Sequence, residues 1–440
     1  MAGARAPLRV AGGGPASRPP WGAALELAAL GAGLTFTFGL MAALPPWLSS
    51  LGRFQALYAL AFVFFALALM RMRRYAALPH VALAVFGVAL AARLALLPVS
   101  PWLSDDLYRY AWEGRVVAAG HDPWRESPLD PALAPLRDRV IWPRVNHPQL
   151  ATIYPPLAEA GFALVARLRY SVTAFKLWVV LHDLALVALL MAILRSRGRS
   201  PAWALTYAWN PLAVVEYAGS GHNDPTAMVW LALALLAAER RPALSALALS
   251  AGALVKLAPL VALPFLWRGW TWRARLACAV TLAAGLGWFW TETRGGSSGL
   301  RAYWETWRNN ELVFHYLERW TGGFAPARAL VLALTAAALA WAWRRWRDPA
   351  PAARFGLRAA TLVAPVVHPW YLGWPLLFEP LAPSAPWLLL SLTGVLNYGV
   401  LAPTAEGRGY HLPLAWRWVE YGAPLLLALV LAAFRRLRRR

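Results

Sequence analysis

Residues 78–115 read LPHVALAVFGVALAARLALLPVSPWLSDDLYRYAWEGR, an apolar run followed closely by acids, arginines and aromatics. The apolar part, residues 78–97, is long enough to cross a bilayer, because a spanning helix needs about 20 such residues. The chain has only 21 acidic residues in 440, so adjacent carboxylates at Asp105 and Asp106 are unusual at a membrane boundary. Ionisable groups in such a place favour a binding or reaction site over ordinary surface decoration.

Apolar runs recur along the whole chain. Hydrophobic residues make up 59% of the sequence, charged residues make up 15%, and the mean hydropathy is +0.45. These values exclude an ordinary soluble domain. Runs suited to spanning include residues 21–47, 54–70, 78–97, 172–194 and 414–434. We predict an all-α polytopic membrane protein with about 11 to 13 transmembrane helices.

The formal net charge of +22 comes mostly from arginines that stand in short clusters between apolar runs. The clusters lie within residues 71–74, 195–199, 344–347 and 435–440. This is the positive-inside pattern of a multi-pass protein of the cell inner (plasma) membrane, with both termini in the cytoplasm. We therefore expect the arginines to contact anionic membrane lipids and not nucleic acid.

The distribution of polar segments predicts one membrane domain with two outer loops. Residues 1–20 form a disordered basic cytoplasmic N-terminus, residues 21–434 a single transmembrane domain, and residues 435–440 a basic cytoplasmic tail. Within the domain, residues 98–150 and 293–325 are expected on the extracytoplasmic side, the first with helices along the membrane surface. The single cysteine, Cys278, excludes an intrachain disulfide.

Two topologies fit residues 154–275. Literal counting makes residues 156–168 a complete span and places residues 195–199 outside. The positive-inside rule instead keeps that cluster in the cytoplasm and places residues 219–224 outside. We prefer the second topology, which requires a partial or surface helix after Tyr154 and a helix break at residues 256–259, where Pro259 interrupts backbone hydrogen bonding.

The first outer loop offers candidate catalytic groups. In a helix that starts near Asp105, the i, i+4 spacing places Asp105 beside Arg109 and Asp106 beside Tyr110. Capping of the helix N-terminus explains one carboxylate but not both. The alternative is that one aspartate accepts a proton from an attacking hydroxyl, while the other orients it or binds a divalent cation, which the acids permit without requiring.

Other polar residues near apolar segments have a structural and a functional interpretation. Arg109 and Arg115 could bind phosphate oxygens or extend to lipid headgroups. Lys176 and Lys256 lie in apolar stretches, where an ammonium usually faces a cavity or an acidic partner. The remaining candidates could serve a site or only a turn, a helix cap or an aromatic belt: His147, Tyr154, His222, Asp224 and His368.

Taken in order, several short motifs resemble the polyprenyl-phosphate-sugar-dependent glycosyltransferases of the GT-C superfamily. The resemblance is to bacterial mannosyltransferase-like members and, more distantly, to the catalytic subunit of the first GPI mannosyltransferase. The matching pieces are residues 104–114, 120–124, 146–148, 154–157, 209–211, 219–224, 256–259 and 368–371.

This resemblance implies a GT-C-type bundle and an inverting transferase, and it identifies no cofactor. The catalytic acid would lie in the first outer loop, residues 98–150. A sugar, mannose or another hexose, would pass from a polyprenyl-phosphate donor to a lipid- or glycan-linked acceptor. Asp105 or Asp106 would be the base, and the resemblance does not decide between them. Substrate-binding residues would be Tyr108, Arg109, Arg115, His147, Tyr154, His222, Asp224, Lys256 and His368. A flippase of lipid-linked sugars and a noncatalytic assembly subunit are the alternatives.

Overall fold

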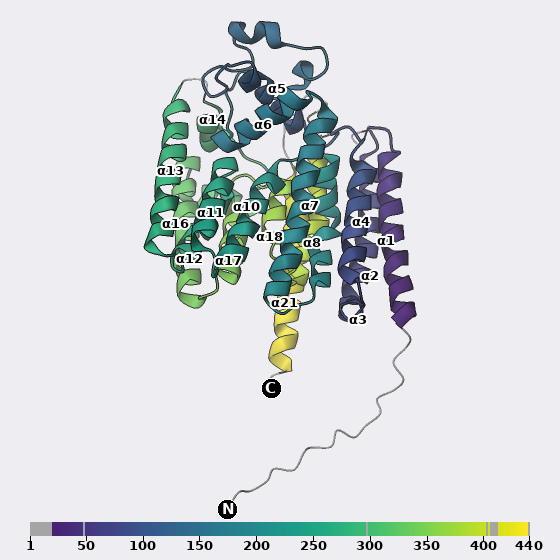
Figure 1. Ribbon diagram of the computed structural model, residues 1–440. Coiled ribbons are helices and arrows are strands. Elements are labelled where there is room, and N and C mark those ends of the chain that lie inside the picture. Colours follow the sequence, from purple (N-terminus) through teal and green to yellow (C-terminus); the bar gives the residue numbers. More distant parts are fainter. Residues whose placement is uncertain (1–19, 47–48, 296–297, 402–403, 405–411, 439–440) are drawn as a thin grey trace, which may run out of the picture.

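The computed structural model describes residues 20–46, 49–295, 298–401, 404 and 412–438, and regular structure within them is helical (Figure 1). Five of the described helices are long and apolar enough to cross a membrane: α1 (Pro20–Ala42), α2 (Leu51–Met70), α7 (Val172–Ser196), α16 (Phe324–Arg345) and α21 (Leu414–Leu437). The shorter apolar helices include α4 (Val81–Leu96), α10 (Asp224–Ala237) and α11 (Pro242–Val255). The all-helical, membrane-spanning prediction is confirmed for the described residues, whereas the number of spans stays a prediction.

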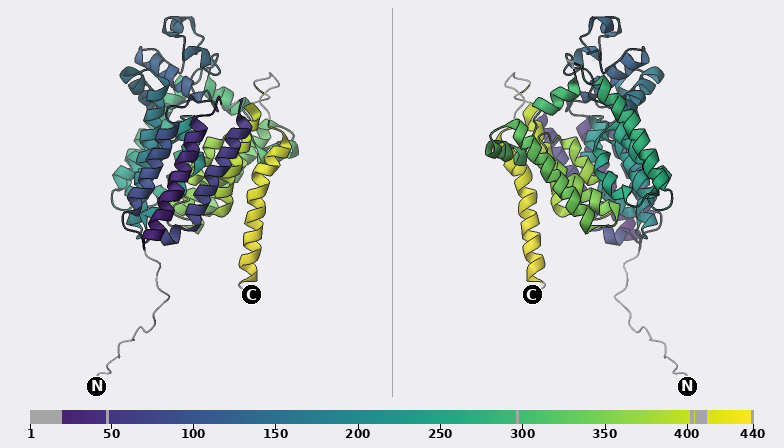
Figure 2. Two further views of the ribbon diagram at one scale, coloured as in Figure 1. Left: turned by 90° about the vertical axis from the view of Figure 1, so that its right-hand side faces the viewer. Right: turned by 90° about the vertical axis from the view of Figure 1, so that its left-hand side faces the viewer.

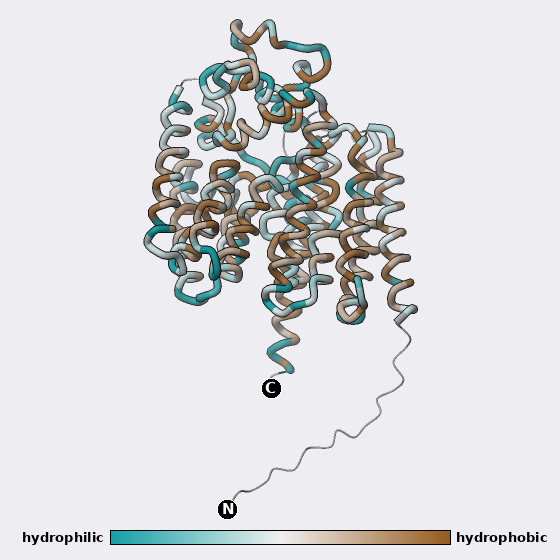
Figure 3. Tube along the Cα trace, in the orientation of Figure 1, coloured by the Kyte–Doolittle hydropathy of each residue, from teal (hydrophilic) through white to brown (hydrophobic). Residues whose placement is uncertain are grey.

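The helices form two layers. Upright helices rich in apolar residues make up the larger layer, and helices α5 (Asp106–Ala118) and α6 (Pro156–Leu168) lie across its upper end (Figures 1 and 3). The helix predicted from about Asp105 to Ala119 is therefore observed as α5. Two short 3₁₀ helices, η1 (Pro131–Leu136) and η2 (Trp142–Arg144), follow α5 in the same upper layer. Helix α6 belongs to this layer, as the preferred topology requires.

The arginine clusters at residues 71–74 and 195–199 lie at the same end of the bundle, opposite the layer of α5 and α6 (Figure 1). Helix α3 (Met72–Tyr75) contains the first cluster, and the second follows the end of α7. A hydrogen bond from Ser200 Oγ to the carbonyl of Ala76 (3.1 Å) joins the two turns. This placement agrees with the preferred topology. Which side of the membrane that end faces stays a prediction.

Helices α5 and α6 pack closely because a glycine lies at their contact. A Cβ atom on Gly114 would collide with the backbone carbonyl of Phe162. One turn away, the rings of Tyr110 and Phe162 stack with centroids 5.0 Å apart and planes 13° apart. Since α5 begins at Asp106, this contact fixes the direction of the helix that presents the two aspartates.

We expect Gly114→Ala to lower the free energy of unfolding by about 1–3 kcal/mol, because overpacking shifts the backbone of α6. The measurement is the thermal unfolding midpoint of the purified protein in detergent. Gly87→Ala is the matched control, since Gly87 is also helical and has no atom within 4 Å of the added Cβ. Equal midpoints for the two variants would contradict the proposed role of the α5 and α6 contact.

Two charged residues are fully buried among the upright helices. Arg93 of α4 donates from Nε to Asp183 of α7 (2.6 Å) and from Nη1 to the carbonyl of Ala208 (2.7 Å). The second oxygen of Asp183 accepts a hydrogen bond from Tyr207 (2.6 Å) in α8 (Leu205–Ala208). Because both charges are paired away from water, they bind three helices together.

Lys176 corrects one expectation from the sequence. Its ammonium is buried and has no acidic partner within the ranges that the structure describes. It donates instead to the carbonyls of Leu96 (2.7 Å) and Val99 (2.5 Å) at the end of α4. A helix C-terminus leaves such carbonyls without intrahelical partners and favours a nearby cation, so Lys176 caps α4.

The middle of the chain consists of interrupted helices. Asn210 caps α9 (Pro211–Ala213) by accepting a hydrogen bond from the amide of Leu212 (2.9 Å), and a π-helical turn, η4 (Val214–Gly219), continues from it. Helix α11 ends at Val255, and η5 (Ala258–Ala262) and α12 (Leu263–Trp267) follow after the irregular residue Lys256. The break predicted at residues 256–259 is confirmed, and it lets polar side chains point inward at membrane depth.

The C-terminal half adds a second group of helices. Its elements are α13 (Trp272–Glu292), α14 (Gly299–Thr306), α15 (Leu312–Thr321), α17 (Pro349–Val363), η6 (Pro369–Leu372), α18 (Gly373–Leu376), α19 (Ala385–Thr393) and η7 (Gly394–Val400). Asn309 pairs with Val366 in a short parallel bridge. Asn310 Nδ2 donates to Glu420 of α21 (2.8 Å). These contacts hold the upper part of α21, whose lower part stands apart from the other helices (Figure 2).

Candidate functional site

Asp105 and Asp106 lie side by side where α5 begins, and one amide joins them. Asn146 Nδ2 donates to Asp105 Oδ1 (2.8 Å) and to Asp106 Oδ1 (2.9 Å). Ser104 Oγ accepts a hydrogen bond from the Asp106 amide (3.2 Å), while neither aspartate side chain caps the helix. Capping therefore does not explain the pair. Sequence reasoning overlooked Asn146, although it directly precedes His147 in one of the matching motifs.

The two carboxylates have different surroundings. Loss of solvation under the surrounding loops, and then the charge of Asp106, raise the pKa of Asp105 from 3.8 to about 6. Burial raises the pKa of Tyr154 and of Tyr303, and the charge of Asp106 adds to this effect. Asp106 is less exposed than Asp105 and lies 3.9 Å from the buried ring of His222, so it is the inner carboxylate of the pair.

The segment between η4 and α10 brings His222 toward these carboxylates. Gly221 has φ of +78°, and a Cβ there would meet the Leu107 side chain of α5 at 2.7 Å, so only glycine allows this close approach. His222 is fully buried, and its Nε2 lies 3.9 Å from Asp106 Oδ2. Its ring stacks on Trp370 with centroids 3.7 Å apart.

Several buried polar atoms of this segment have no hydrogen-bond partner within the described part of the chain. They are Ser220 Oγ, both ring nitrogens of His222, Asn223 Nδ2 and Asp224 Oδ2. An unpaired buried polar group costs about 1–3 kcal/mol, so a protein rarely keeps several together without a ligand or water to satisfy them. This group of atoms therefore indicates a place where a polar substrate binds.

Lys256 supplies a cation beside the same segment. Its ammonium lies 2.7 Å from Asp224 Oδ1, which also accepts a hydrogen bond from Trp374 Nε1 (2.7 Å). The expectation of an acidic partner for Lys256 is confirmed. The ammonium lies 5.0 Å from the ring centre of Tyr371, and its side chain is 24% exposed. It therefore keeps access to a bound anion.

His368 is held as a neutral hydrogen-bond donor. Asn309 Nδ2 lies 2.8 Å from His368 Nδ1, and an amide donor there leaves the ring proton on Nε2. Burial, with the charges of His222 and Lys256 adding to it, lowers the pKa of His368 to about 3. The ring stacks on Trp370 with centroids 4.2 Å apart, so both histidines rest on one indole.

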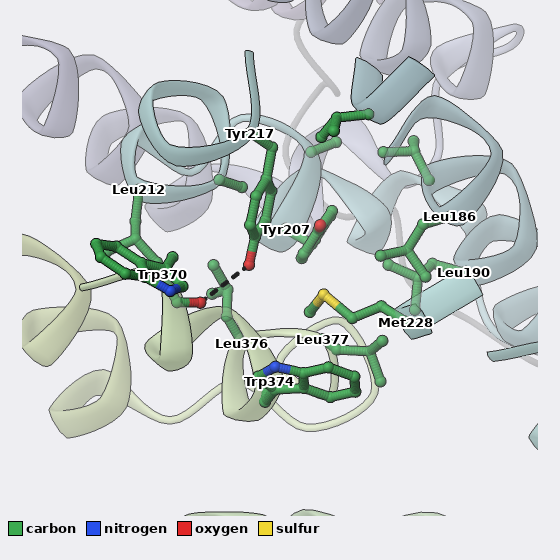
Figure 4. Close-up of a cluster of buried hydrophobic side chains, with 14 of the residues drawn as sticks. Leu186, Leu190, Tyr207, Leu212, Tyr217, Met228, Trp370, Trp374, Leu376 and Leu377 are labelled. Carbon is green, nitrogen blue, oxygen red and sulfur yellow. Dashed lines mark hydrogen bonds between the residues drawn. The ribbon is translucent and has the colours of Figure 1, made fainter. Parts of the chain in front are cut away.

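Apolar packing fixes the indoles that support these groups. Figure 4 shows Tyr217, Trp370 and Trp374 in a cluster of buried side chains, with Met228 near Trp374. Tyr217 donates to the carbonyl of Trp370 (3.2 Å). A Cβ on Gly373 would collide with Tyr217, so glycine lets the start of α18 lie close to η4. The floor of the site is therefore part of the hydrophobic core.

The segment predicted as the second outer loop provides aromatic side chains that sequence reasoning did not single out. Tyr303 of α14 lies 3.2 Å, oxygen to oxygen, from Tyr371. Trp307 packs against the exposed ring of His147 with centroids 4.6 Å apart. His147 has φ of +41°, a strained conformation for a non-glycine residue and one that often occurs at functional sites. Partial burial and the charge of Arg109 lower the pKa of His147.

Arg109 is not available for a phosphate, because its guanidinium is buried and fully engaged. It pairs with Glu113 (2.5 Å), not with Asp105 as the spacing suggested. It also donates to the carbonyls of Asn146 (3.1 Å), His147 (3.1 Å) and Leu150 (2.6 Å). Arg109 thus anchors the segment that presents Asn146 to the two aspartates.

Three further candidates lie outside the group around Asp106. Arg115, in the last turn of α5, lies 3.6 Å from Asp138 and packs over Tyr170. Tyr108 is mostly buried beneath Arg144, whose guanidinium lies 5.4 Å from its ring centre. Tyr154 packs edge-on against Tyr110 with centroids 5.2 Å apart, so its ring supports the wall of the site.

Metal ligands do not gather in the described residues. No group of three or more His, Cys, Asp or Glu side chains there has an arrangement that could hold a metal ion.

The model of glycosyltransferase family 87 matches residues 152–369, about half of the chain. The matched region contains the segment with His222, the helix break at Lys256 and the first two residues of the motif that begins at His368. No curated protein and no solved structure matches the chain.

Proposed function

Because the chain is a GT-C-type glycosyltransferase related to family 87, we propose that it moves a hexose, such as mannose, from a polyprenyl-phosphate donor to a lipid- or glycan-linked acceptor. The reaction takes place on the extracytoplasmic face and inverts the anomeric carbon. The observation that carries this proposal is the meeting of a carboxylate pair with a cation and two histidines. Asp106 lies 3.9 Å from His222 Nε2, and Lys256 adjoins the same segment through Asp224.

The chemistry needs a base on the acceptor side and positive charge on the phosphate side. Asp106 is our choice for the base, because its carboxylate is the inner one of the pair and a positioned carboxylate can take the proton of an attacking hydroxyl. Asp105 and Asn146 hold it in place. The acceptor oxygen attacks the anomeric carbon while the bond from that carbon to the phosphate oxygen breaks, through an oxocarbenium-like transition state.

The departing phosphate gains negative charge in this step. Lys256 and the Nε2–H of His368 are the groups that we assign to it. Donors aimed at the place where charge develops lower the barrier more than they strengthen ground-state binding. Phosphate is a good leaving group, so the mechanism needs no second carboxyl group as a general acid.

A panel of polyprenyl-phosphate sugars tests the proposal. Membranes containing the native chain, Asp105→Asn or Asp106→Asn are supplied with each donor, and expression is checked for every variant. We expect transfer with the native chain and loss with Asp106→Asn. If lipid-linked sugar only crosses the bilayer, the flippase alternative replaces this function. If neither substitution changes transfer, the aspartates are not catalytic.

The flippase alternative would use charged groups free inside the membrane. Arg93 and Asp183, two of the charged residues buried among the upright helices, are instead paired with each other. This pairing favours a structural role for them and leaves the transferase as the preferred function.

We expect Lys256→Met to raise the KM for the donor about 10- to 100-fold, since a charge-assisted hydrogen bond contributes about 1.5–3 kcal/mol. The acceptor KM should change less than the donor KM. The control is Lys256→Met with Asp224→Asn, which removes the buried carboxylate left unpaired by the first change. An unaltered donor KM in both variants would exclude Lys256 from the phosphate site.

A further inference from the structure

Glu216 is a buried carboxylate that the proposed reaction does not yet use. It lies in the π-helical turn η4, and both of its oxygens accept hydrogen bonds from Tyr398 (2.6 and 2.7 Å). Its Oε2 lies 3.1 Å from His222 Nδ1, outside hydrogen-bonding geometry but within ion-pair distance. Acids in apolar segments are costly, so a buried one beside a candidate site favours a role in function.

The backbone brings Glu216 and His222 together. The amide of His222 donates to the carbonyl of Glu216 (3.0 Å), and the amide of Ser220 donates to the carbonyl of Val215 (2.8 Å). Wide turns of this kind are rare within helices and frequent at functional sites. The stack on Trp370 fixes the plane of the imidazole, so its two nitrogens point to different carboxylates.

The result is an imidazole between two acids: Glu216 near Nδ1 and Asp106 near Nε2, at 3.1 and 3.9 Å. No group in the described chain forms a hydrogen bond with either ring nitrogen. A carboxylate beside one nitrogen keeps the proton there and leaves the other nitrogen free to accept one.

We infer that Glu216 is a positioning residue that holds His222 ready to take the proton from Asp106 after each transfer and to pass it to the departing phosphate. This inference rests on the proposed function. The acceptor O–H bond breaks and an O–H bond forms on Asp106. That bond then breaks as an N–H bond forms at His222 Nε2, and the resulting imidazolium pairs with Glu216.

The final step returns the catalytic groups to their starting state. The Nε2–H bond of His222 breaks and an O–H bond forms on the polyprenyl phosphate, which leaves as its monoanion. The donor phosphodiester and the phosphate product then carry the same charge, and no proton has to cross the bundle. A bridging water or a small movement of the side chains closes the 3.9 Å gap.

Other titratable groups lie around Glu216, His222 and Asp106 and influence where the proton resides. Around Glu216 they are Tyr58, Tyr217 and Tyr398, and around His222 they are Asp105, Asp106 and His368. Tyr398→Phe removes both hydrogen bonds to Glu216 while keeping its carboxylate. Comparing this variant with Glu216→Gln therefore separates the effect of the position of Glu216 from the effect of its charge.

The test is a double-mutant cycle on the full-length purified chain, with polyprenyl-phosphate sugar as the donor. We expect Glu216→Gln to lower kcat at least tenfold in the native background, with donor KM within about twofold and a larger solvent deuterium isotope effect on kcat. In a His222→Asn background, the same substitution should change kcat less than twofold, because residues that act through one another are not additive.

Equal losses in the two backgrounds would overturn the inference, because a merely structural role does not depend on His222. An unchanged kcat and isotope effect for Glu216→Gln would overturn it as well. If Glu216→Gln does not fold, the cycle is run with Tyr398→Phe and Glu216→Asp under the same criteria. A native chain that transfers no sugar would refute the proposed function itself, which distinguishes that failure from failure of this inference.

Discussion

Asp106→Asn is expected to reduce the turnover of sugar transfer about 10²- to 10⁴-fold, the usual contribution of a positioned general base. The amide keeps the shape of the carboxylate but cannot accept the proton of the acceptor hydroxyl. Donor KM should change little, because the phosphate contacts that we propose come from other residues. The measurement is kcat of the purified variant with a saturating polyprenyl-phosphate sugar, alongside its thermal unfolding midpoint.

Asp105→Asn is the matched control, since both carboxylates share the amide of Asn146. We expect a loss of about tenfold or less, well below that for the base itself. The native pair should lose activity as pH falls through about 6, where Asp105 takes up a proton. This loss near pH 6 should be absent from Asp105→Asn, because the group that takes up the proton has been removed.

Two outcomes would contradict this assignment. Loss of turnover with Asp105→Asn and near-native turnover with Asp106→Asn would exchange the roles of the two residues. Near-native turnover for both would remove the carboxylate pair from the chemistry.

The second large effect concerns the buried pair of Arg93 and Asp183. Asp183→Ala leaves the guanidinium of Arg93 buried without its counterion, so we expect the free energy of unfolding to fall by about 3–5 kcal/mol. The measurement is thermal unfolding in detergent, followed by tryptophan fluorescence.

The control replaces both charges with apolar groups, as Arg93→Met with Asp183→Leu. Such a replacement is often neutral or stabilising, so the double variant should be more stable than Asp183→Ala alone. If Asp183→Ala unfolds at the same midpoint as the native protein, the pair does not hold α4, α7 and α8 together.

The sequence predicted elements that depend on length and local pattern. The apolar runs near residues 54–70 and 172–194 became α2 and α7, and the acidic cluster began α5 as expected. The break at Lys256 followed from Pro259. The positions at which the interrupted helices end depend on packing between distant segments, so spacing along the sequence does not predict them. The π-helical turn that ends at Gly219 is an example.

The site was predictable in its residue types but not in all its partners. Asp105 and Arg109 have the i, i+4 spacing, yet Arg109 has the same spacing to Glu113, which is its partner in the structure. The carbonyls of residues 146–150 decided between them, and that contact crosses about 40 residues of sequence. Glu216 could have been noticed as a single acid in an otherwise apolar run.

The most direct test of the central claim is the stoichiometry of transfer in proteoliposomes that contain the purified chain and a polyprenyl-phosphate hexose. Labelled sugar in the acceptor, polyprenyl phosphate released and donor translocated are measured in the same sample. The account predicts one polyprenyl phosphate released for each sugar transferred, with inverted anomeric configuration and loss of both products in Asp106→Asn. Donor that crosses the bilayer with its sugar still attached, and no release of polyprenyl phosphate, would contradict it.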